Sequence, residues 1–310
     1  MTQITKPAIK LMEYIGDAEY AAINELAAIC SKYDGTALKL ELDYKLALAK
    51  EKERTAGLAD INELMYFDGE KLIGYIGIGC FGGSGSMPEI NGMVHPDYRG
   101  QGVFTTMHQW TVLELRRRGK KTALLLCDGA KQAGKQFIQA LGAKHEHSEY
   151  EMYVRHEGEK KAVPPITLRK ASNSDAKEIA RQNAIYFGDE HSVSKDGEDA
   201  APQRGMMMPE EEEKRGMTMY LAYADGEIAG KVHAQISGGI GGIYGLGVLP
   251  EFRGRGLGRA ILVAGVEKLK EMGAIEIMLQ VVTENANALH LYESCGFEVT
   301  SIMEYYELSV

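Results

Sequence analysis

The sequence predicts two α+β domains in tandem, each with a mixed, mainly antiparallel central sheet flanked by helices. The chain has 310 residues, a length that suggests two domains rather than one. The segment MVHPDYRGQGVF at residues 93–104 recurs as GVLPEFRGRGLG at residues 247–258, and such a repeat indicates an internal duplication. Around both segments the patterns of strands and helices follow one another in the same order.

A linker separates the two predicted domains. Residues 157–165 read EGEKKAVPP, and charged residues followed by two prolines continue neither a strand nor a helix. We therefore expect an N-terminal domain at residues 1–156, a linker at 157–164 and a C-terminal domain at 165–310.

The C-terminal half is expected to begin with a short strand and a helix, which a polar segment follows. Asp225-Gly226 is a strong hairpin signal between two strands. A third strand leads through Pro250 and a cluster of glycines and arginines into a long helix. The expected elements are strand 166–170, helix 174–186, strands 219–223, 227–235 and 242–248, helix 256–272, strand 276–282, helix 285–294 and strand 297–308.

The N-terminal half repeats this order with a more helical start. Its hairpin signal is Asp68-Gly69, again between two apolar strand patterns. The expected elements are helices 17–32 and 43–54, strands 63–67, 72–80 and 89–94, helix 100–118, strand 122–127, helix 131–141 and strand 149–155.

The composition excludes several classes of protein. Hydrophobic residues make up 45% of the chain, which is ordinary for a globular protein, and the net charge of -9 argues against a general nucleic-acid binder. No apolar run is long enough to span a membrane, and residues 1–13 lack the pattern of a secretory signal. The four cysteines lie far apart with no CxxC pair, so we expect a cytoplasmic protein without a metal site.

The most informative segment is 247–259, a strand that leads into a helix through Arg253-Gly254-Arg255-Gly256-Leu257-Gly258. A helix N-terminus offers unpaired N–H groups, glycines let an anion approach them, and the arginines add positive charge. This predicts a phosphate or diphosphate ligand. A dinucleotide fingerprint would read GxGxxG after the first strand of a βαβ unit, and a P-loop would end in GK[ST], whereas these glycines run GxGxG after a third strand. A turn that only starts a helix is the remaining alternative.

Two motifs in the C-terminal half resemble those of the GCN5-related N-acetyltransferase (GNAT) superfamily. The acyl-CoA-binding pattern [RQ]-x-x-G-x-[GA] is met by Arg253, Gly256 and Gly258. The second pattern, N-x-x-A-x-x-x-Y followed by G-F, is met by Asn285 and Tyr292, with Ala288 and Gly296-Phe297 in the remaining places.

The resemblance implies a fold, a cofactor and a set of site residues. The strand ending at 248 would separate from the strand at 276–282, and the pantetheine of acetyl-CoA would enter the gap. Asn285 would line the cofactor side, and Tyr292 would protonate the departing thiolate as a general acid. Backbone groups would bind the pantetheine and the pyrophosphate, at Leu246, Val248, Arg253, Gly254, Arg255, Gly256, Leu257, Gly258 and Arg259.

The general base is less well defined by the sequence. Many family members carry a glutamate at the position that matches Tyr244 here, and residues 241–248 contain no carboxylate. His233, Glu284, a residue of 188–216 or an amine that arrives neutral are the alternatives. A histidine in the middle of a strand, such as His233, is more often structural than catalytic.

The N-terminal copy of the motifs is incomplete. Arg99 and Gly102 are kept, but Phe104 stands where the pattern needs Gly or Ala. Ile138 stands opposite Tyr292 and cannot donate a proton, and Lys131 stands opposite Asn285. We therefore expect a degenerate N-terminal domain and a catalytic C-terminal one.

The expected function is acetyl transfer from acetyl-CoA to a primary amine of a small molecule or peptide, by direct attack in a ternary complex. A non-catalytic acyl-CoA-binding or sensor protein is the alternative. Residues 189–215 hold nine acidic and four basic side chains, which favours a cationic acceptor if the segment covers the site. A solvated loop is the plainer interpretation of the same residues. No metal, nucleic acid or membrane partner is expected.

Overall fold

The computed structural model describes residues 2–35, 38–51, 59–79, 87–159, 161–187 and 208–310. These residues form two compact units. The first unit contains the described residues up to Ser148 together with Ser301–Val310, and the second contains Glu149–Thr300. Among the described residues, no helix has the length and apolar character needed to cross a bilayer.

The first unit is built on a mixed sheet with the strand order β1-β2-β3-β4-β5-β12. Its first four strands are antiparallel neighbours, β4 and β5 are parallel, and β12 runs antiparallel to β5. The strands are β1 Pro7–Met12, β2 Glu63–Asp68, β3 Lys71–Gly79, β4 Glu89–Val94, β5 Thr122–Asp128 and β12 Phe297–Ser309. The helices are α1 Asp17–Asp34, α2 Leu42–Glu51, α3 Val103–Arg117 and α4 Gln132–Ala140, with a 3₁₀ turn at Pro96–Tyr98.

Helices cover both faces of this sheet. Val103, Met107 and Leu115 of α3 pack with Ile138 of α4 in one apolar cluster. The helix α1 packs in a second cluster, which contains alternate residues of the same strands. This arrangement follows from the two-residue period of a strand, which sends successive side chains to opposite faces.

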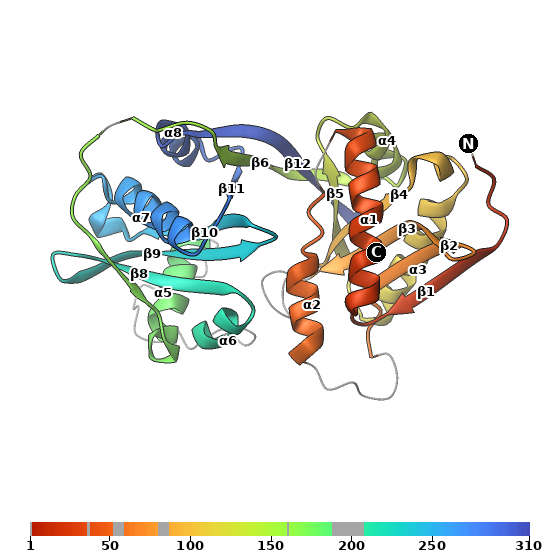
Figure 1. The fold of residues 1–310 in the computed structure, drawn as a ribbon, viewed down its shortest axis with the longest axis horizontal. Coiled ribbons are helices and arrows are strands. Elements are labelled where there is room, and N and C mark those ends of the chain that lie inside the picture. Colours follow the sequence, from red (N-terminus) through yellow and green to blue (C-terminus); the bar gives the residue numbers. More distant parts are fainter. Residues whose placement is uncertain (1, 36–37, 52–58, 80–86, 160, 188–207) are drawn as a thin grey trace. The chain divides into compact units, whose positions relative to one another are not determined.

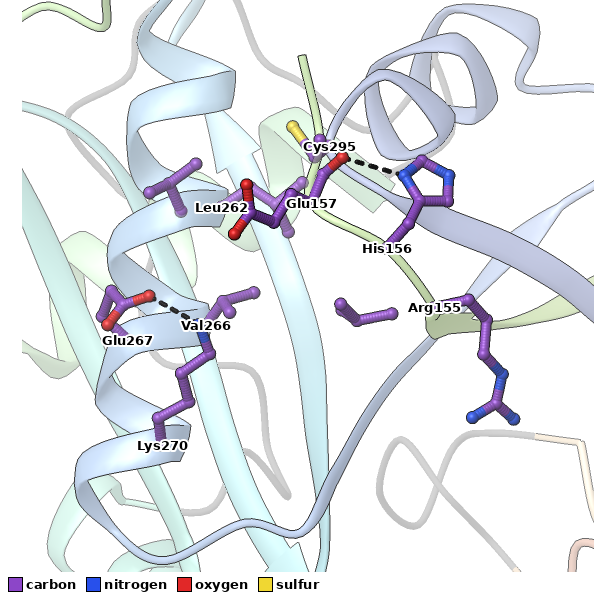
Figure 2. A pocket seen from close by; sticks show the side chains of 11 residues that line it. Arg155, His156, Glu157, Leu262, Val266, Glu267, Lys270 and Cys295 are labelled. Carbon is purple, nitrogen blue, oxygen red and sulfur yellow. Dashed lines mark hydrogen bonds and ion pairs between the residues drawn. The ribbon is translucent and has the colours of Figure 1, made fainter. Parts of the chain in front are cut away.

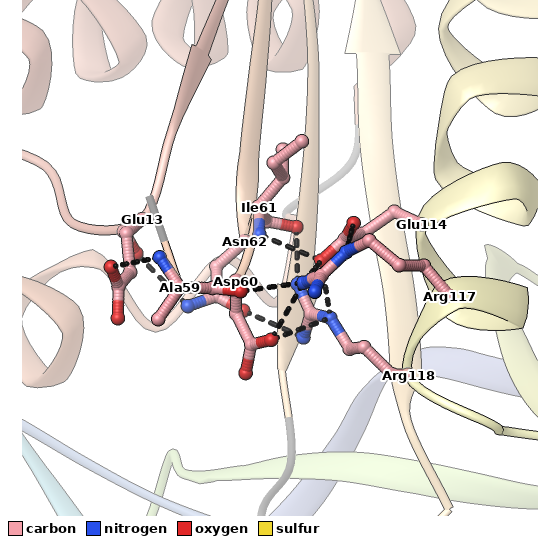
Figure 3. Close-up of polar contacts among 8 residues, drawn as sticks. All are labelled: Glu13, Ala59, Asp60, Ile61, Asn62, Glu114, Arg117 and Arg118. Atoms are coloured by element: carbon pink, nitrogen blue, oxygen red, sulfur yellow. Dashed lines mark hydrogen bonds and ion pairs between the residues drawn. The ribbon is translucent and has the colours of Figure 1, made fainter. Parts of the chain in front are cut away.

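A buried carboxylate fastens α3 to the chain that precedes β2 (Figure 3). Glu114 is 4% exposed. It accepts hydrogen bonds from the Ile61 N–H at 2.9 Å, from Arg117 Nε at 2.7 Å and from Arg118 Nε at 2.7 Å. The carboxylate is thus compensated by two cations and one amide, as a buried charge requires.

The second unit repeats the architecture, with the strand order β6-β11-β10-β9-β8-β7. The helix α7 packs on β9 and β10 through the core that contains Val232 and Ala234, whereas α5 packs against the other face (Figure 1). The strands are β6 Lys144–Val154, β7 Thr167–Lys170, β8 Met217–Ala224, β9 Glu227–Ser237, β10 Ile240–Val248 and β11 Glu276–Val282. The helices are α5 Ala176–Phe187, α6 Pro209–Lys214, α7 Leu257–Glu271 and α8 Ala286–Ser294, with 3₁₀ turns at Asn173–Asp175 and Pro250–Phe252.

The compact units differ from the two halves of the chain. Residues Glu149–Tyr153 of β6, at the end of the N-terminal half, pair with β11 of the second unit. Residues Met303–Ser309 of β12, at the end of the C-terminal half, pair with β5 of the first unit. The two halves therefore exchange their last strands. The segment expected as a linker is also tied down, because the Glu159 N–H donates to the Ser294 carbonyl at 2.9 Å.

Most expected elements are present within one to three residues of their expected ends, and strands 89–94 and 276–282 match exactly in both bounds. The strand β1 was not expected. The expected C-terminal ends of helix 43–54 and strand 72–80 lie outside the described residues.

Candidate functional site

The strands β10 and β11 separate toward their C-terminal ends, as expected. Their parallel ladder runs from Ile240 and Glu276 to Ile243 and Leu279, although both strands continue further. On its other side, β10 has a register shift against β9 between Tyr244 and Gly247. Neither ladder pairs Leu246, so its peptide groups lie outside the regular sheet bonding.

The helix α7 starts beside this opening. Gly256 is its N-cap, with φ of 78°, and Gly254 has φ of 74°. Both values lie in the left-handed region that glycine adopts without a steric cost. The first helical bond runs from the Ala260 N–H to the Gly256 carbonyl, so the three preceding amides of the helix have no acceptor within it. These amides and the helix dipole form a place for an anion.

The three arginines of the segment have different surroundings. Arg253 donates from Nε to the Val248 carbonyl at 3.1 Å, which braces the end of β10. Arg255 is exposed and pairs with Asp225 at 3.0 Å. Arg259 is largely buried and donates to the backbone and side chain of Ser294, so it connects α7 to the end of α8. Arg255 and Arg259 therefore already have partners, whereas the described residues offer Arg253 no carboxylate.

The second motif shapes α8. Asn285 is exposed and caps the helix, because its side chain accepts from the Ala288 N–H at 3.1 Å. Tyr292 is 9% exposed and its ring lies 6.2 Å from the ring of Phe297. Burial raises the pKa of Tyr292, so its hydroxyl keeps its proton at neutral pH and can donate it.

Two aromatic rings rest against the backbone of β10 on the face covered by α5. A Cβ at Gly247 would lie 2.2 Å from the ring of Tyr186, and a Cβ at Gly245 would lie 3.0 Å from the imidazole of His233. Both positions therefore need glycine. The sequence GLG in β10 is explained by these contacts from α5 and β9.

Lys231 is a residue of this face that sequence reasoning missed. It is 1% exposed, donates to Asn183 Oδ1 at 2.6 Å and lies 3.2 Å from His233 Nε2. Burial lowers its pKa to about 8. The signal was present in the sequence: Lys231 and His233 occupy alternate positions in the middle of the strand, and such positions face one side of the sheet.

The first unit repeats the loop but fills its surroundings. Gly102 caps α3 with φ of 77°, and Arg99 Nε donates to the Val94 carbonyl at 3.0 Å, as in the second unit. Here, however, Arg99 also forms two bonds with the Asp34 carboxylate, of 2.8 and 2.7 Å. The ring of Phe104 packs edge-on against Phe137, with centroids 5.0 Å apart.

The corresponding position in the second unit is open. A Cβ at Gly258 would meet Leu291 at 3.4 Å and Val248 at 3.8 Å, which are ordinary contacts. In the first unit, a Cβ at Gly92 of β4 would lie 3.1 Å from the Phe104 ring, so that ring lies against the strand. The space beside the separating strand is therefore occupied in the first unit.

A separate pocket of about 420 Å³ opens on the second unit next to α7 (Figure 2). Leu262 and Val266 form one wall, and residues 154–158 and Cys295 form the other. None of residues 246–258 lines it, so it is distinct from the opening between β10 and β11. Most of the acidic segment expected near the acceptor, residues 188–207, lies outside the described residues.

Comparison with known proteins gives matches in sequence and in structure. Residues 184–297 match the model of the acetyltransferase (GNAT) family. A mycothiol acetyltransferase from Thermobispora bispora is 27% identical over 303 residues, which cover 93% of this chain and 95% of that protein. This relative extends the similarity through both halves of the chain.

Two solved structures share the fold. A GCN5-related N-acetyltransferase from Sphaerobacter thermophilus has a TM-score of 0.71 at 18% identity and covers 98% of this chain and 95% of its own. A tandem GNAT protein from the clavulanic acid biosynthesis pathway has a TM-score of 0.70 at 15% identity and covers 98% of both chains. These two likenesses show a shared tandem fold. By the family match over residues 184–297 and the relative that spans both halves, the chain is a tandem-domain member of the GNAT superfamily and an acyl-CoA-dependent acetyltransferase.

Proposed function

We propose that the second unit transfers an acetyl group from acetyl-CoA to the primary amine of a small molecule, by direct attack within a ternary complex. The observation that carries this proposal is the opening between β10 and β11, which lies beside the N-terminus of α7. An extended pantetheine fits a gap between two strands, and a pyrophosphate suits the free amides of a helix start.

The backbone of residues 253–259 would bind the pyrophosphate, with Arg253 as a nearby cation to which the described residues offer no carboxylate. The peptide groups of Leu246 and Val248 would pair with the pantetheine. Their fixed dipoles would also polarise the thioester carbonyl and stabilise the charge that develops on its oxygen. Acetyl-CoA supplies the activated acyl group and the thiolate leaving group.

Tyr292 would act as the general acid. Its hydroxyl would donate a proton to the departing thiolate, and its raised pKa keeps it protonated until then. Asn285 would line the cofactor side. Its side chain also caps α8 and so fixes the start of the helix that carries Tyr292.

The acceptor is proposed by analogy with relatives. The protein from Thermobispora bispora is named a mycothiol acetyltransferase. The amine acceptor of that enzyme class is therefore the first candidate for this chain, followed by other small primary amines.

Calorimetric titration of acetyl-CoA tests which unit binds the cofactor. The informative variant is Gly258→Phe. It gives the second unit the phenylalanine that the first unit has at the matching position, Phe104. Gly258 has no left-handed φ, so this change fills space without straining the backbone, unlike a change at Gly256. Forcing a ring into the opening should weaken binding about 10- to 100-fold.

The matched control is Phe104→Gly in the first unit, which should leave both the affinity and the stoichiometry of one acetyl-CoA per chain unchanged. Tight binding that survives Gly258→Phe, or that disappears with Phe104→Gly, would place the cofactor elsewhere. An amine screen with wild-type protein, followed by thiol release, then tests the transfer itself. Absence of acetyl-CoA binding to the wild type would refute the proposal.

A further inference from the structure

Two titratable side chains lie together on the α5 face of the second unit. Lys231 and His233 are alternate residues of β9, with exposed fractions of 1% and 9%. Lys231 Nζ is 3.2 Å from His233 Nε2 and donates to Asn183 Oδ1 of α5 at 2.6 Å. A lysine in such a position costs free energy because its charge is removed from water, so its retention calls for a role.

The pair lies against the part of β10 that the proposed function assigns to the thioester. His233 is opposite Tyr244 in the β9–β10 ladder, and Lys231 is opposite Gly247. Nδ1 and Cε1 of His233 each come to 3.0 Å of the Cβ position at Gly245, within the register shift. One ring nitrogen of His233 thus faces the irregular part of β10, while the other faces Lys231.

Neither side chain suffices alone. Burial and the nearby Lys231 charge hold the pKa of His233 well below its usual range. For each unit by which the pKa of the base is lower than the pKa of the substrate ammonium, proton transfer becomes ten times less favourable. His233 by itself is therefore a poor base for this ammonium. Lys231 has a pKa of about 8, and its Nζ contacts Asn183 Oδ1 and His233 Nε2.

The described residues that face the pair from α5, β10 and β8 supply no charge that titrates near neutral pH. From α5, the Tyr186 ring lies 5.9 Å from Lys231 Nζ, and burial raises its pKa far above the usual range. From β10, Tyr244 faces His233, and from β8, the partners Leu221 and Met219 carry no titratable group.

We propose that His233 and Lys231 form a relay that removes the proton from the acceptor ammonium, an inference that rests on the proposed function. With Lys231 neutral, His233 donates from Nε2–H to Nζ, and its Nδ1 lone pair faces the acceptor. Nδ1 takes one ammonium proton while the Nε2 proton passes to Nζ. His233 therefore stays neutral throughout, and Lys231 becomes the ammonium that Asn183 binds.

The remaining steps balance without a further reactant. The freed amine forms the C–N bond at the thioester carbon, the C–S bond breaks, and the thiolate takes the Tyr292 proton. The second proton lost by the nitrogen restores Tyr292, and Lys231 releases the first to water. The sum is ammonium plus acetyl-CoA giving amide, free CoA and one proton. His233 contacts the substrate, and Lys231 acts through it.

The test uses Lys231→Arg, Lys231→Met and His233→Gln. Arginine keeps the positive charge but does not lose its proton in a protein, and glutamine hydrogen-bonds without relaying. With an amine that the wild type acetylates, we expect kcat/KM to fall about a hundredfold in each variant. Acetyl-CoA affinity should stay the same, which excludes general damage. A fluorinated analogue of that amine, already neutral at pH 7, should lose less than about threefold in the same variants.

A second measurement needs no acceptor. The 13Cε and 15Nζ resonances of Lys231, assigned by comparison with Lys231→Arg, should titrate near pH 8. Titration above pH 10, or full kcat/KM in Lys231→Arg with the ordinary amine, would overturn the relay while leaving the acetyltransferase proposal intact. Equal losses with both amines would also overturn it, because they would indicate a purely structural role. A wild type that transfers no acetyl group would refute the proposed function and the relay with it.

Discussion

The buried carboxylate of Glu114 gives a stability prediction whose magnitude follows from the structure. Its hydrogen bonds with Arg117, and further bonds from Ile61 and Arg118, lower its pKa from an ordinary value of 4.5 to about 2. At about 1.4 kcal/mol for each pKa unit, the full shift is worth on the order of 3 kcal/mol. Because the Arg117 side chain is 54% exposed, water screens part of the interaction. We therefore expect Glu114→Gln to destabilise the first unit by about 1–2 kcal/mol at pH 7.

The pH dependence has a definite sign. A carboxylate whose pKa is lower in the folded protein contributes its stability above the unfolded pKa, and loses it as pH falls through the folded pKa. The difference between wild type and Glu114→Gln should therefore be constant above about pH 5 and shrink between pH 4.5 and about 2.

The assay can follow this unit alone. The chain has one tryptophan, and Trp110 lies on α3, one turn from Glu114. Its fluorescence during urea unfolding therefore reports on the first unit. Glu267→Gln on α7 is a matched control, because that glutamate is 58% exposed and pairs with Lys270 along the helix surface. An unchanged midpoint for Glu114→Gln, or a difference that persists at pH 2, would refute the argument.

Three further predictions concern the site and the exchanged strand. Tyr292→Phe should lower turnover about a hundredfold with little change in acetyl-CoA affinity, measured by thiol release and calorimetry, and unaltered turnover would exclude it as the acid. Deleting residues 301–310 removes the strand that pairs with β5 of the first unit, so Trp110 fluorescence should report unfolding at much lower urea, and an unchanged midpoint would contradict the strand exchange. Gly296→Ala should lower stability by at least about 1 kcal/mol in thermal unfolding, because φ is 92° and the new Cβ would lie 2.1 Å from the His156 carbonyl oxygen; a neutral result would show that this turn relaxes freely.

Local features of the fold could be predicted from the sequence. The Asp-Gly hairpins, the glycines before the two long helices and the strands at 89–94 and 276–282 depend on neighbouring residues, and the structure places them where expected. The helix cap at Asn285 also depends on neighbouring residues, because the side chain of Asn285 accepts from the N–H of Ala288, three residues later.

The strand exchange could not be predicted in this way. The apolar pattern of 297–308 predicts a strand, but the same pattern suits either sheet edge, and pairing is decided by contacts distant in sequence. The partners of Arg255 and Arg259 were missed for a related reason. The motif places both arginines near the helix start, whereas Asp225 and Ser294, which they contact, come from other parts of the chain.

The duplicated loop shows how the proposed binding site differs from its copy in the first unit. Both loops have nearly the same glycine dihedral angles and the same arginine-to-strand bond, so backbone geometry alone favours an anion equally in the two units. The difference lies in side chains. In the first unit a carboxylate neutralises the arginine, and Phe104 fills the space beside β4. If the first unit binds no cofactor, as we propose, its loop needs another source of stability, and the Arg99–Asp34 pair and the Phe104–Phe137 contact supply it. We therefore infer that the first unit retains this loop as part of its core. We also infer that cofactor binding depends on the space beside β10, which Gly258 leaves open in the second unit.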